Sequence, residues 1–399
     1  MNRTYGRLLL LQALLAAANS MAAVFAIIYL LDVANFSRTD AVLFNLLSFA
    51  VAALGCVALT RFPPRRMRTW MAAGLVALAA SYGAYLVLSG WPLLLFVAVA
   101  WGAYIPAFFL PFNALVIGIT RPEDRAGKIA SFILAYTVIG IAGPTVGGAI
   151  IGASGYPLLF ALAVAVLLAA VAFLTQIRES VAPVTFAFDF GGIGRRTSVA
   201  LFAEGAFEGM SFGVIPLIAY AFTTESEDLG ALFSLFALAG GVVTVVLGVW
   251  SDRVRNRRPF LFLGAAASAA AATLVVRAGT LPEFALGNSL LALTASIAPL
   301  FLFAIAVERL PGRESAAIVT REVLLNSGRT ASLAAYFVLV SLGLSVQQAF
   351  VLASVSIAFV AVGRPPKAEG QSRPSVPSPP PAASGARMPV PVKRPARRR

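Results

Sequence analysis

Twelve long apolar segments are the feature of this sequence that most constrains its fold. Most run for about 20 to 25 residues, and a helix that rises about 1.5 Å per residue crosses the roughly 30 Å hydrocarbon core over that length. Hydrophobic residues make up 59% of the 399-residue chain and charged residues only 12%, which is too little polar cover for a soluble globule. The alternation of about ten residues that is typical of membrane β-barrels is not seen. The sequence therefore predicts an all-α integral membrane protein.

The predicted spans follow one another with short loops between them. The first run has no small-residue cleavage pattern and is followed at once by further spans, so we interpret it as a retained helix and not as a removed signal peptide. The twelve spans are expected at residues 7–32, 41–60, 69–89, 92–118, 129–152, 155–176, 197–222, 229–250, 259–279, 284–307, 315–341 and 345–363.

Basic residues in the loops predict the orientation. The loops after the even-numbered spans carry nearly all of them, whereas the opposite side has only Arg38 and Arg277. Because basic loops stay in the cytoplasm, we expect both termini to be cytoplasmic. The same bias, with a basic C-terminal tail, accounts for the net charge of +14 without any nucleic-acid partner.

The two halves of the chain resemble each other at an offset of 188 to 189 residues. Such a repeat predicts two pseudo-symmetric six-helix bundles in parallel arrangement, with a transport site near the middle of the bilayer at their interface. The matches are Arg7 with Arg196, Asn19 with Glu208, Asp40 with Asp228, and Pro122 with Pro311.

Four regions are expected from this pattern: an N-terminal six-helix bundle at 1–176, a cytoplasmic linker at 177–196, a C-terminal six-helix bundle at 197–363, and a tail at 364–399. The tail is rich in Pro, Ser and Arg and has no apolar periodicity, so we expect it to be disordered. Its terminal "KRPARRR" either contacts anionic lipid or is solvated and reinforces the topology.

Residues that serve common catalytic and metal sites are scarce. The chain has no histidine, its one cysteine, Cys56, lies in an apolar run, and it lacks the phosphate-binding loop of ATPases. We therefore expect no metal, no cofactor and no enzymatic activity.

The loop after the eighth span, "GVWSDRVRNRR", resembles the Gly-x-x-x-Asp-Arg-x-Gly-Arg-Arg/Lys-Arg/Lys signature of the major facilitator superfamily. Arg255 stands where that signature has its second glycine. In the family the aspartate, here Asp252, sits at a cytoplasmic helix end and pairs with the other half to hold one of two alternating-access states. A basic loop that only follows the positive-inside rule would explain the arginines but not Asp252. The matching residues are Gly248, Asp252, Arg253, Arg257 and Arg258.

The fifth span contains "GIAGPTVGGAI", which is similar to the Gly-Pro-x-x-Gly-Gly core of exporters in that superfamily. The match lies at Gly143, Pro144, Gly147 and Gly148. Pro144 removes a backbone donor and kinks the helix, and the small residues allow close approach to a neighbouring helix. We expect these residues, with Gly248, Asp252 and Arg253, to take part in gating.

The resemblance has two departures. The first-half loop "TRFPPRRMRTW" has no aspartate, and the fourth span lacks the arginine that many proton-coupled drug exporters of the family carry. The usual drug/proton exporter mechanism therefore does not transfer as it stands.

Charged residues inside spans are expensive and usually face the bundle interior or a water-filled cavity. Glu204 and Glu208 lie one turn apart near the middle of span seven, and Glu322, Asn326 and Arg329 share one face of span eleven. Two neighbouring carboxylates repel, so at least one is expected to hold a proton unless a cation compensates. The expected substrate-binding or proton-coupling residues are Glu208, Glu204, Arg329, Asn19, Glu322 and Asn326.

We interpret Glu208 as the proton-coupling or cationic-substrate residue, with Arg329 as its partner and Asn19 facing it across the cavity. The alternative is a permanent structural ion pair of Glu208 or Glu204 with Arg329 or Arg321, because the superfamily arrangement can bring helices seven and eleven together.

The resemblance implies a monomeric secondary-active transporter in the inner (cytoplasmic) membrane of a prokaryote, which moves a small organic solute across the bilayer by alternating access. Proton coupling is expected and the span-five motif slightly favours export. The alternatives are an uptake permease of the same fold and a transporter-like membrane sensor that binds a partner.

Overall fold

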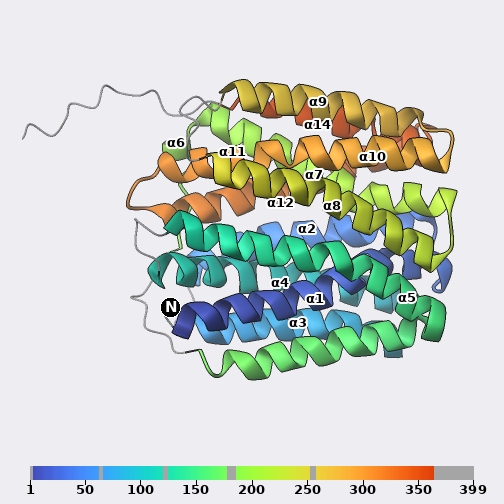
Figure 1. Cartoon of the computed structure of the whole chain (residues 1–399), viewed down its shortest axis with the longest axis horizontal. Helices are drawn as coiled ribbons and strands as arrows, with labels where there is room; N and C mark the ends of the chain where they lie inside the picture. The colour runs from blue at the N-terminus through green and yellow to red at the C-terminus, as the bar shows by residue number, and fades with distance from the viewer. Residues whose placement is uncertain (1–2, 63–65, 120–124, 178–185, 252–257, 364–399) are drawn as a thin grey trace, which may run out of the picture. The chain divides into compact units, whose positions relative to one another are not determined.

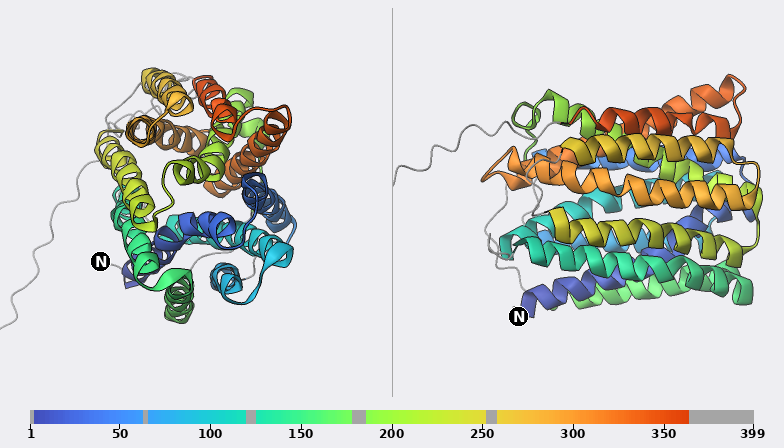
Figure 2. Two further views of the ribbon diagram at one scale, coloured as in Figure 1. Left: turned by 90° about the vertical axis from the view of Figure 1, so that its right-hand side faces the viewer. Right: turned by 45° about the horizontal axis from the view of Figure 1, so that its top comes forward.

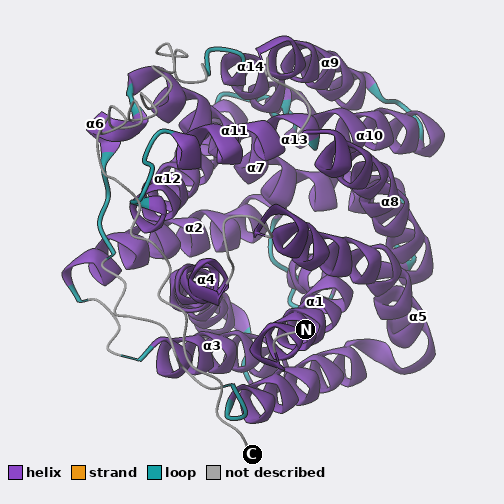
Figure 3. Cartoon of the chain, turned by 60° about the vertical axis from the view of Figure 1, so that its left-hand side comes forward, coloured by secondary structure: helices purple, strands orange, loops and turns teal. Residues whose placement is uncertain are grey.

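The computed structural model describes residues 3–62, 66–119, 125–177, 186–251 and 258–363, and every regular element in these ranges is a helix (Figure 3). Ten of the helices in the described ranges are long and apolar enough to cross a membrane. One of these, Leu134–Leu174, is long enough for two crossings, and Val346–Val360 adds a shorter apolar segment. The predicted all-α membrane fold is therefore confirmed.

Five helices form the N-terminal bundle (Figure 1). Their bounds are α1 Arg3–Asp32, α2 Arg38–Arg61, α3 Met67–Val87, α4 Gly90–Ile119 and α5 Arg125–Leu174. The long α5 contains two of the expected spans, because Gly155 interrupts it with φ 78° and ψ 172°. This backbone conformation is open to glycine and strained for other residues, so the break between the spans expected at 129–152 and 155–176 lies at Gly155.

The C-terminal bundle contains the remaining helices. Their bounds are α6 Phe190–Ile193, α7 Arg195–Phe222, α8 Ser226–Ser251, α9 Arg258–Arg277, α10 Leu281–Ala295, α11 Ile297–Glu308, α12 Glu314–Ser341, α13 Val346–Ala349 and α14 Val351–Val360. The expected tenth span is divided at Ser296 into α10 and α11, and the expected twelfth span at Phe350 into α13 and α14.

Capping residues in the sequence determine where some helices begin. Ser37 and Asp40 form a capping box at the start of α2, and Thr280 and Glu283 form another at the start of α10. Each box satisfies backbone N–H groups that the first turn leaves unpaired. Asp40, one of the residues that indicated the repeat, therefore has a local role at a helix end.

Helices within each bundle run side by side, and the two bundles meet along two seams (Figures 1 and 2). In the N-terminal bundle α1 packs on α5 and α3 on α4, and in the C-terminal bundle α7 packs on α12 and α9 on α10. Between the bundles, α5 packs on α8 and α2 packs on α12. This arrangement places α1, α2, α5, α7, α8 and α12 at the boundary between the bundles.

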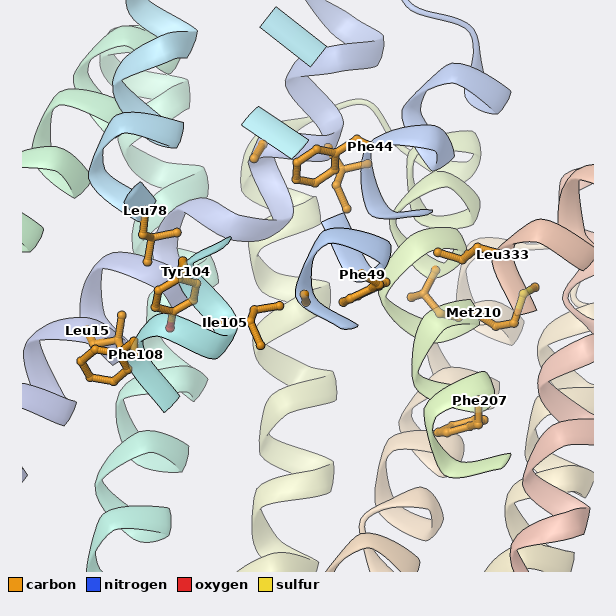
Figure 4. Packing of buried hydrophobic residues seen from close by; sticks show 14 of the residues in the cluster. Leu15, Phe44, Phe49, Leu78, Tyr104, Ile105, Phe108, Phe207, Met210 and Leu333 are labelled. Atoms are coloured by element: carbon orange, nitrogen blue, oxygen red, sulfur yellow. The ribbon is translucent and has the colours of Figure 1, made fainter. Parts of the chain in front are cut away.

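Apolar side chains fill the interior and also cover much of the outside. Figure 4 shows Leu15, Tyr104 and Phe108 of the N-terminal bundle in one group, and all three are buried. Leu54, Phe262 and Leu286 are more than 60% exposed, at 70%, 62% and 63%. Large exposed apolar side chains of this kind on membrane-length helices are suited to lipid.

Candidate functional site

Glycines bring α7 and α12 into direct contact. A methyl group at Gly205 would collide with the main chain of Leu325, and one at Gly328 would collide with the main chain of Phe202. Small residues at such positions let two membrane helices approach closely. The close approach places the two glutamates of α7 opposite the two arginines of α12.

Glu208 and Arg329 form the first ion pair across this contact. Nε and Nη2 of Arg329 donate to Oε2 of Glu208 at 3.0 and 2.5 Å. A third nitrogen, Nη1, donates to Oδ1 of Asn326 at 2.8 Å, which holds the guanidinium in place. The side chains of Arg329 and Glu208 are 12% and 20% exposed, so the pair is mostly but not fully removed from solvent.

Arg321 lies between the other two glutamates. Its Nη2 is 3.2 Å from Oε1 of Glu204, and its Nη1 is 2.8 Å from Oε1 of Glu322. Glu204 is fully buried, and its second oxygen, Oε2, has no hydrogen-bond partner. A buried carboxylate oxygen without a partner is costly.

These five charged side chains, Glu204, Glu208, Arg321, Glu322 and Arg329, are called the charged cluster below. Asn326 connects its two parts, because its Nδ2 donates to the backbone oxygen of Glu322 at 2.8 Å while its Oδ1 accepts from Arg329. With every group ionised, three carboxylates face two guanidiniums, which leaves one negative charge in excess. One proton or one cationic group would neutralise the charged cluster.

The charged cluster reaches the N-terminal bundle through Phe49 of α2. The guanidinium of Arg329 lies 5.2 Å from the ring centre of Phe49 and 5.8 Å from that of Phe212. The two rings are 6.3 Å apart, and Phe212 is 50% exposed. Figure 4 shows Phe49 and, from α7, Phe207 and Met210 among the buried side chains. Arg329 therefore lies next to the seam between the bundles, at which α2 packs on α12.

Asn19 has partners within its own bundle. Its Oδ1 accepts a hydrogen bond from the hydroxyl of Tyr82 at 2.9 Å. The hydrogen bonds described for the chain do not join Asn19 to Glu208. A role of Asn19 opposite Glu208 therefore stays a prediction.

The four residues of the span-five motif serve two different contacts. A methyl group at Gly143 or Gly147 would collide with α1, at Ser20 and at the main chain of Met21 respectively. Pro144 and Gly148 instead contact α8, because the oxygen of Pro144 lies where a side chain on Gly230 would stand. The motif therefore packs α5 against its own bundle on one side and against the other bundle on the other side.

Only part of the loop signature lies within the described residues. Gly248 lies near the end of α8, whereas Asp252 and Arg253 lie outside the described residues. Their expected role in gating stays a prediction.

Two contacts between the bundles were not expected from the sequence. Asp32, at the end of α1, accepts hydrogen bonds from Tyr156 at 3.2 Å and from Tyr220 at 3.0 Å. In addition, Thr145 of α5 donates to Ser234 of α8 at 2.7 Å. The one signal in the sequence is that Asp32 and Tyr220 are 188 residues apart, which is within one residue of the repeat offset in these two helices.

Comparisons with known proteins agree on one family. The family model described as Major Facilitator Superfamily matches residues 197–397, just over half of the chain. The crystal structure of a major facilitator superfamily transporter, FucP, in the outward conformation matches with a TM-score of 0.63 and 12% identity, over 90% of this chain and 97% of that chain. At this identity the likeness concerns the fold. No curated protein matches the sequence.

Proposed function

Because the chain belongs to the major facilitator superfamily, we propose that it moves a small organic solute across the bilayer in a cycle coupled to protons at the charged cluster. Family and fold make the chain a multi-pass membrane protein and a secondary transporter that works by alternating access. The coupling ion, the direction and the residues involved are the further content of the proposal.

The observation that supports proton coupling is the ion pair of Glu208 and Arg329 beside Phe49 of the other bundle. A proton on Glu208 would cancel its charge and release Arg329 from its ionic partner. Because the charged cluster carries one excess negative charge when every group is ionised, one proton makes the cluster neutral as a whole, which lowers the cost of holding it in the membrane. Because Arg329 lies at the seam, its release would change the interaction between the bundles.

The proposed direction is export. It is supported only by the resemblance of Gly143, Pro144, Gly147 and Gly148 to an exporter motif. A proton that competes with a cationic solute for the charged cluster would give exchange of the two, which suits export driven by an inward proton gradient. An uptake permease would use the same groups for joint binding of proton and solute, and a sensor would bind without any flux.

The proposed orientation places both termini and the 177–196 linker in the cytoplasm, between bundles at 1–176 and 197–363. The distribution of arginine over the loops supports it. A reporter fused after Arg399 should be active only in the cytoplasm, and activity outside the cell would contradict the orientation.

Transport by purified protein in proteoliposomes tests the coupling. A library of organic solutes is first screened by comparing a deletion strain with its parent, and the solutes that respond are then used in vesicles. With Glu208→Gln we expect counterflow of solute to continue, while accumulation driven by a pH gradient falls at least tenfold, because the amide cannot exchange a proton.

Glu225→Gln is the matched control, since this carboxylate lies in the exposed loop after α7. It should transport like the parent in both assays. Full gradient-driven transport by Glu208→Gln would refute coupling at Glu208 and leave it as a structural partner of Arg329. Absence of flux for every solute, with a specific protein partner bound, would favour the sensor.

A further inference from the structure

Asp32 joins three helices at one end of the bundles. This end, at which α1 and α7 end and α2 and α8 begin, is called the distal end and is expected to face the outside of the cell. The carboxylate of Asp32 accepts from Tyr156 of its own bundle through one oxygen and from Tyr220 of the other bundle through the second. The hydrogen bond to Tyr220 therefore joins the bundles directly.

The position of this bond follows from the repeat. Asp32 is the last residue of α1 and Tyr220 lies in the last turn of α7, and these two helices are equivalent in the repeat. In two parallel repeats related by a two-fold axis along the membrane normal, the ends of two equivalent helices can meet only close to that axis. The bond between Asp32 and Tyr220 therefore lies close to the pseudo-two-fold axis.

Contacts on both sides of the axis close the distal half of the bundles as well. On one side Thr145 of α5 donates to Ser234 of α8, and the backbone N–H of Thr145 donates to the same hydroxyl at 3.0 Å. On the other side Gly213 of α7 lies against both Leu333 of α12 and Asn45 of α2, with 2.8 and 3.8 Å from its ideal Cβ position. The axial bond is thus accompanied by one contact between the bundles on each side.

We propose that Asp32 and Tyr220 form an axial latch that holds the distal end closed and that must break each time this end opens. A rocking motion that opens the distal end moves the ends of α1 and α7 apart, so the latch favours the closed state over the open one. The latch goes beyond the proposed coupling, because it acts for any solute and any driving ion.

The expected size of the effect follows from the kind of bond. A hydrogen bond to a charged group contributes more than a neutral one, whereas access of water reduces the contribution. Loss of the Tyr220 hydroxyl should therefore raise the open population by about three- to tenfold.

Labelling of one cysteine measures that population without any solute. Ser234→Cys is placed in a Cys56→Ala background, in the empty protein in membranes, and its reaction with a membrane-impermeant maleimide is followed from the distal side. Because the partly exposed Ser234 is hydrogen-bonded to Thr145 across the bundles when the distal end is closed, a cysteine there should react faster as the open population rises. We expect Tyr220→Phe and Asp32→Ala each to speed labelling about three- to tenfold.

Two further variants distinguish the loss of this one bond from an unspecific weakening of the contacts between helices. The double variant should label no faster than the faster single one, because both changes remove the same bond. Tyr29→Phe is the matched control, since its hydroxyl donates to the backbone oxygen of Tyr85 within one bundle, and it should label at the parental rate. The latch would be overturned if Tyr220→Phe labelled at the parental rate. It would also be overturned if Ser234→Cys without a further change labelled as fast as Glu225→Cys, which lies in the exposed loop after α7.

Discussion

Two helix contacts inside the bundles are equivalent in the repeat: the contact of α7 with α12, called the α7–α12 seam, and the contact of α1 with α5 around Gly143, called the α1–α5 seam. Both bring two helices close together, but with different side chains. Both depend on a glycine against a serine: Gly209 meets Ser332 in the C-terminal bundle, and Gly143 meets Ser20 in the N-terminal bundle. At the offset of 189 residues these positions are equivalent, with glycine and serine exchanged. The charged residues have uncharged equivalents: Asn19 for Glu208, Leu15 for Glu204, Phe132 for Arg321 and Gly140 for Arg329.

The difference shows which of these residues close helix packing requires. Because α1 and α5 pack closely at Gly143 and Gly147 with uncharged residues in the places of Glu204, Glu208, Arg321 and Arg329, close packing of such a helix pair does not require ion pairs. Buried ion pairs contribute little net stability, since the loss of hydration offsets the attraction between the charges. This difference supports the proposed role of the α7 and α12 charges in transport, whereas the small residues are needed for close packing.

Removal of one charge from the α7–α12 seam should lower the unfolding midpoint more than any other change considered below. Arg329→Gln leaves Glu208 without its cation and raises the excess negative charge of the charged cluster. Removing one partner of a buried ion pair lowers the free energy of unfolding by about 3 to 5 kcal/mol. Because this pair is partly exposed, we expect a loss of about 3 kcal/mol. Cys56 is fully buried, so its reaction with a thiol-reactive dye during heating in detergent reports unfolding, and the midpoint should fall clearly.

The double variant Glu208→Gln with Arg329→Gln sharpens the same test. It makes the α7–α12 seam resemble the uncharged α1–α5 seam, so its unfolding midpoint should lie close to that of the parent and above that of Arg329→Gln. If the double variant is as unstable as Arg329→Gln, the charges are needed for folding and the comparison fails.

An added methyl group should have the next largest effect. Gly328→Ala places a methyl against the main chain of Phe202, which cannot move away easily, and overpacking of this kind costs about 1 to 3 kcal/mol. Gly140→Ala is the matched control in the other seam, because nothing lies within 4 Å of its Cβ position. Alanine there should leave the midpoint unchanged or raise it slightly, by the helix propensity gained. Equal loss in both variants would contradict the packing difference.

Much of the fold was predictable because its causes are local. Long apolar runs define the spans, and the break at Gly155 follows from a residue that tolerates φ 78°. The spacing of Glu204 and Glu208 placed them on one helix face, and the two ion pairs with Arg321 and Arg329 correspond to the alternative that pairs helices seven and eleven.

The remaining contacts depend on three-dimensional placement that spacing does not determine. Arg321 and Arg329 are two turns apart on α12, so either could have paired with either glutamate until the glycine contact fixed the relative height of the two helices. The bond of Asp32 to Tyr220 is also non-local. Each residue looks like an ordinary helix end, and only the offset of the repeat connects them.

The smallest expected effect concerns the neutral partner of Asn19. Tyr82→Phe removes a hydroxyl that donates to Asn19 at 2.9 Å, and a single neutral hydrogen bond contributes about 1 kcal/mol. The unfolding midpoint should therefore fall slightly, by less than in Arg329→Gln or Gly328→Ala. Because no charge lies at Asn19, the pH dependence of gradient-driven transport should stay parental, in contrast to Glu208→Gln. A shifted pH profile in Tyr82→Phe would place Asn19 in the coupling pathway after all, and the functional difference between the two seams would then be smaller than their charges indicate.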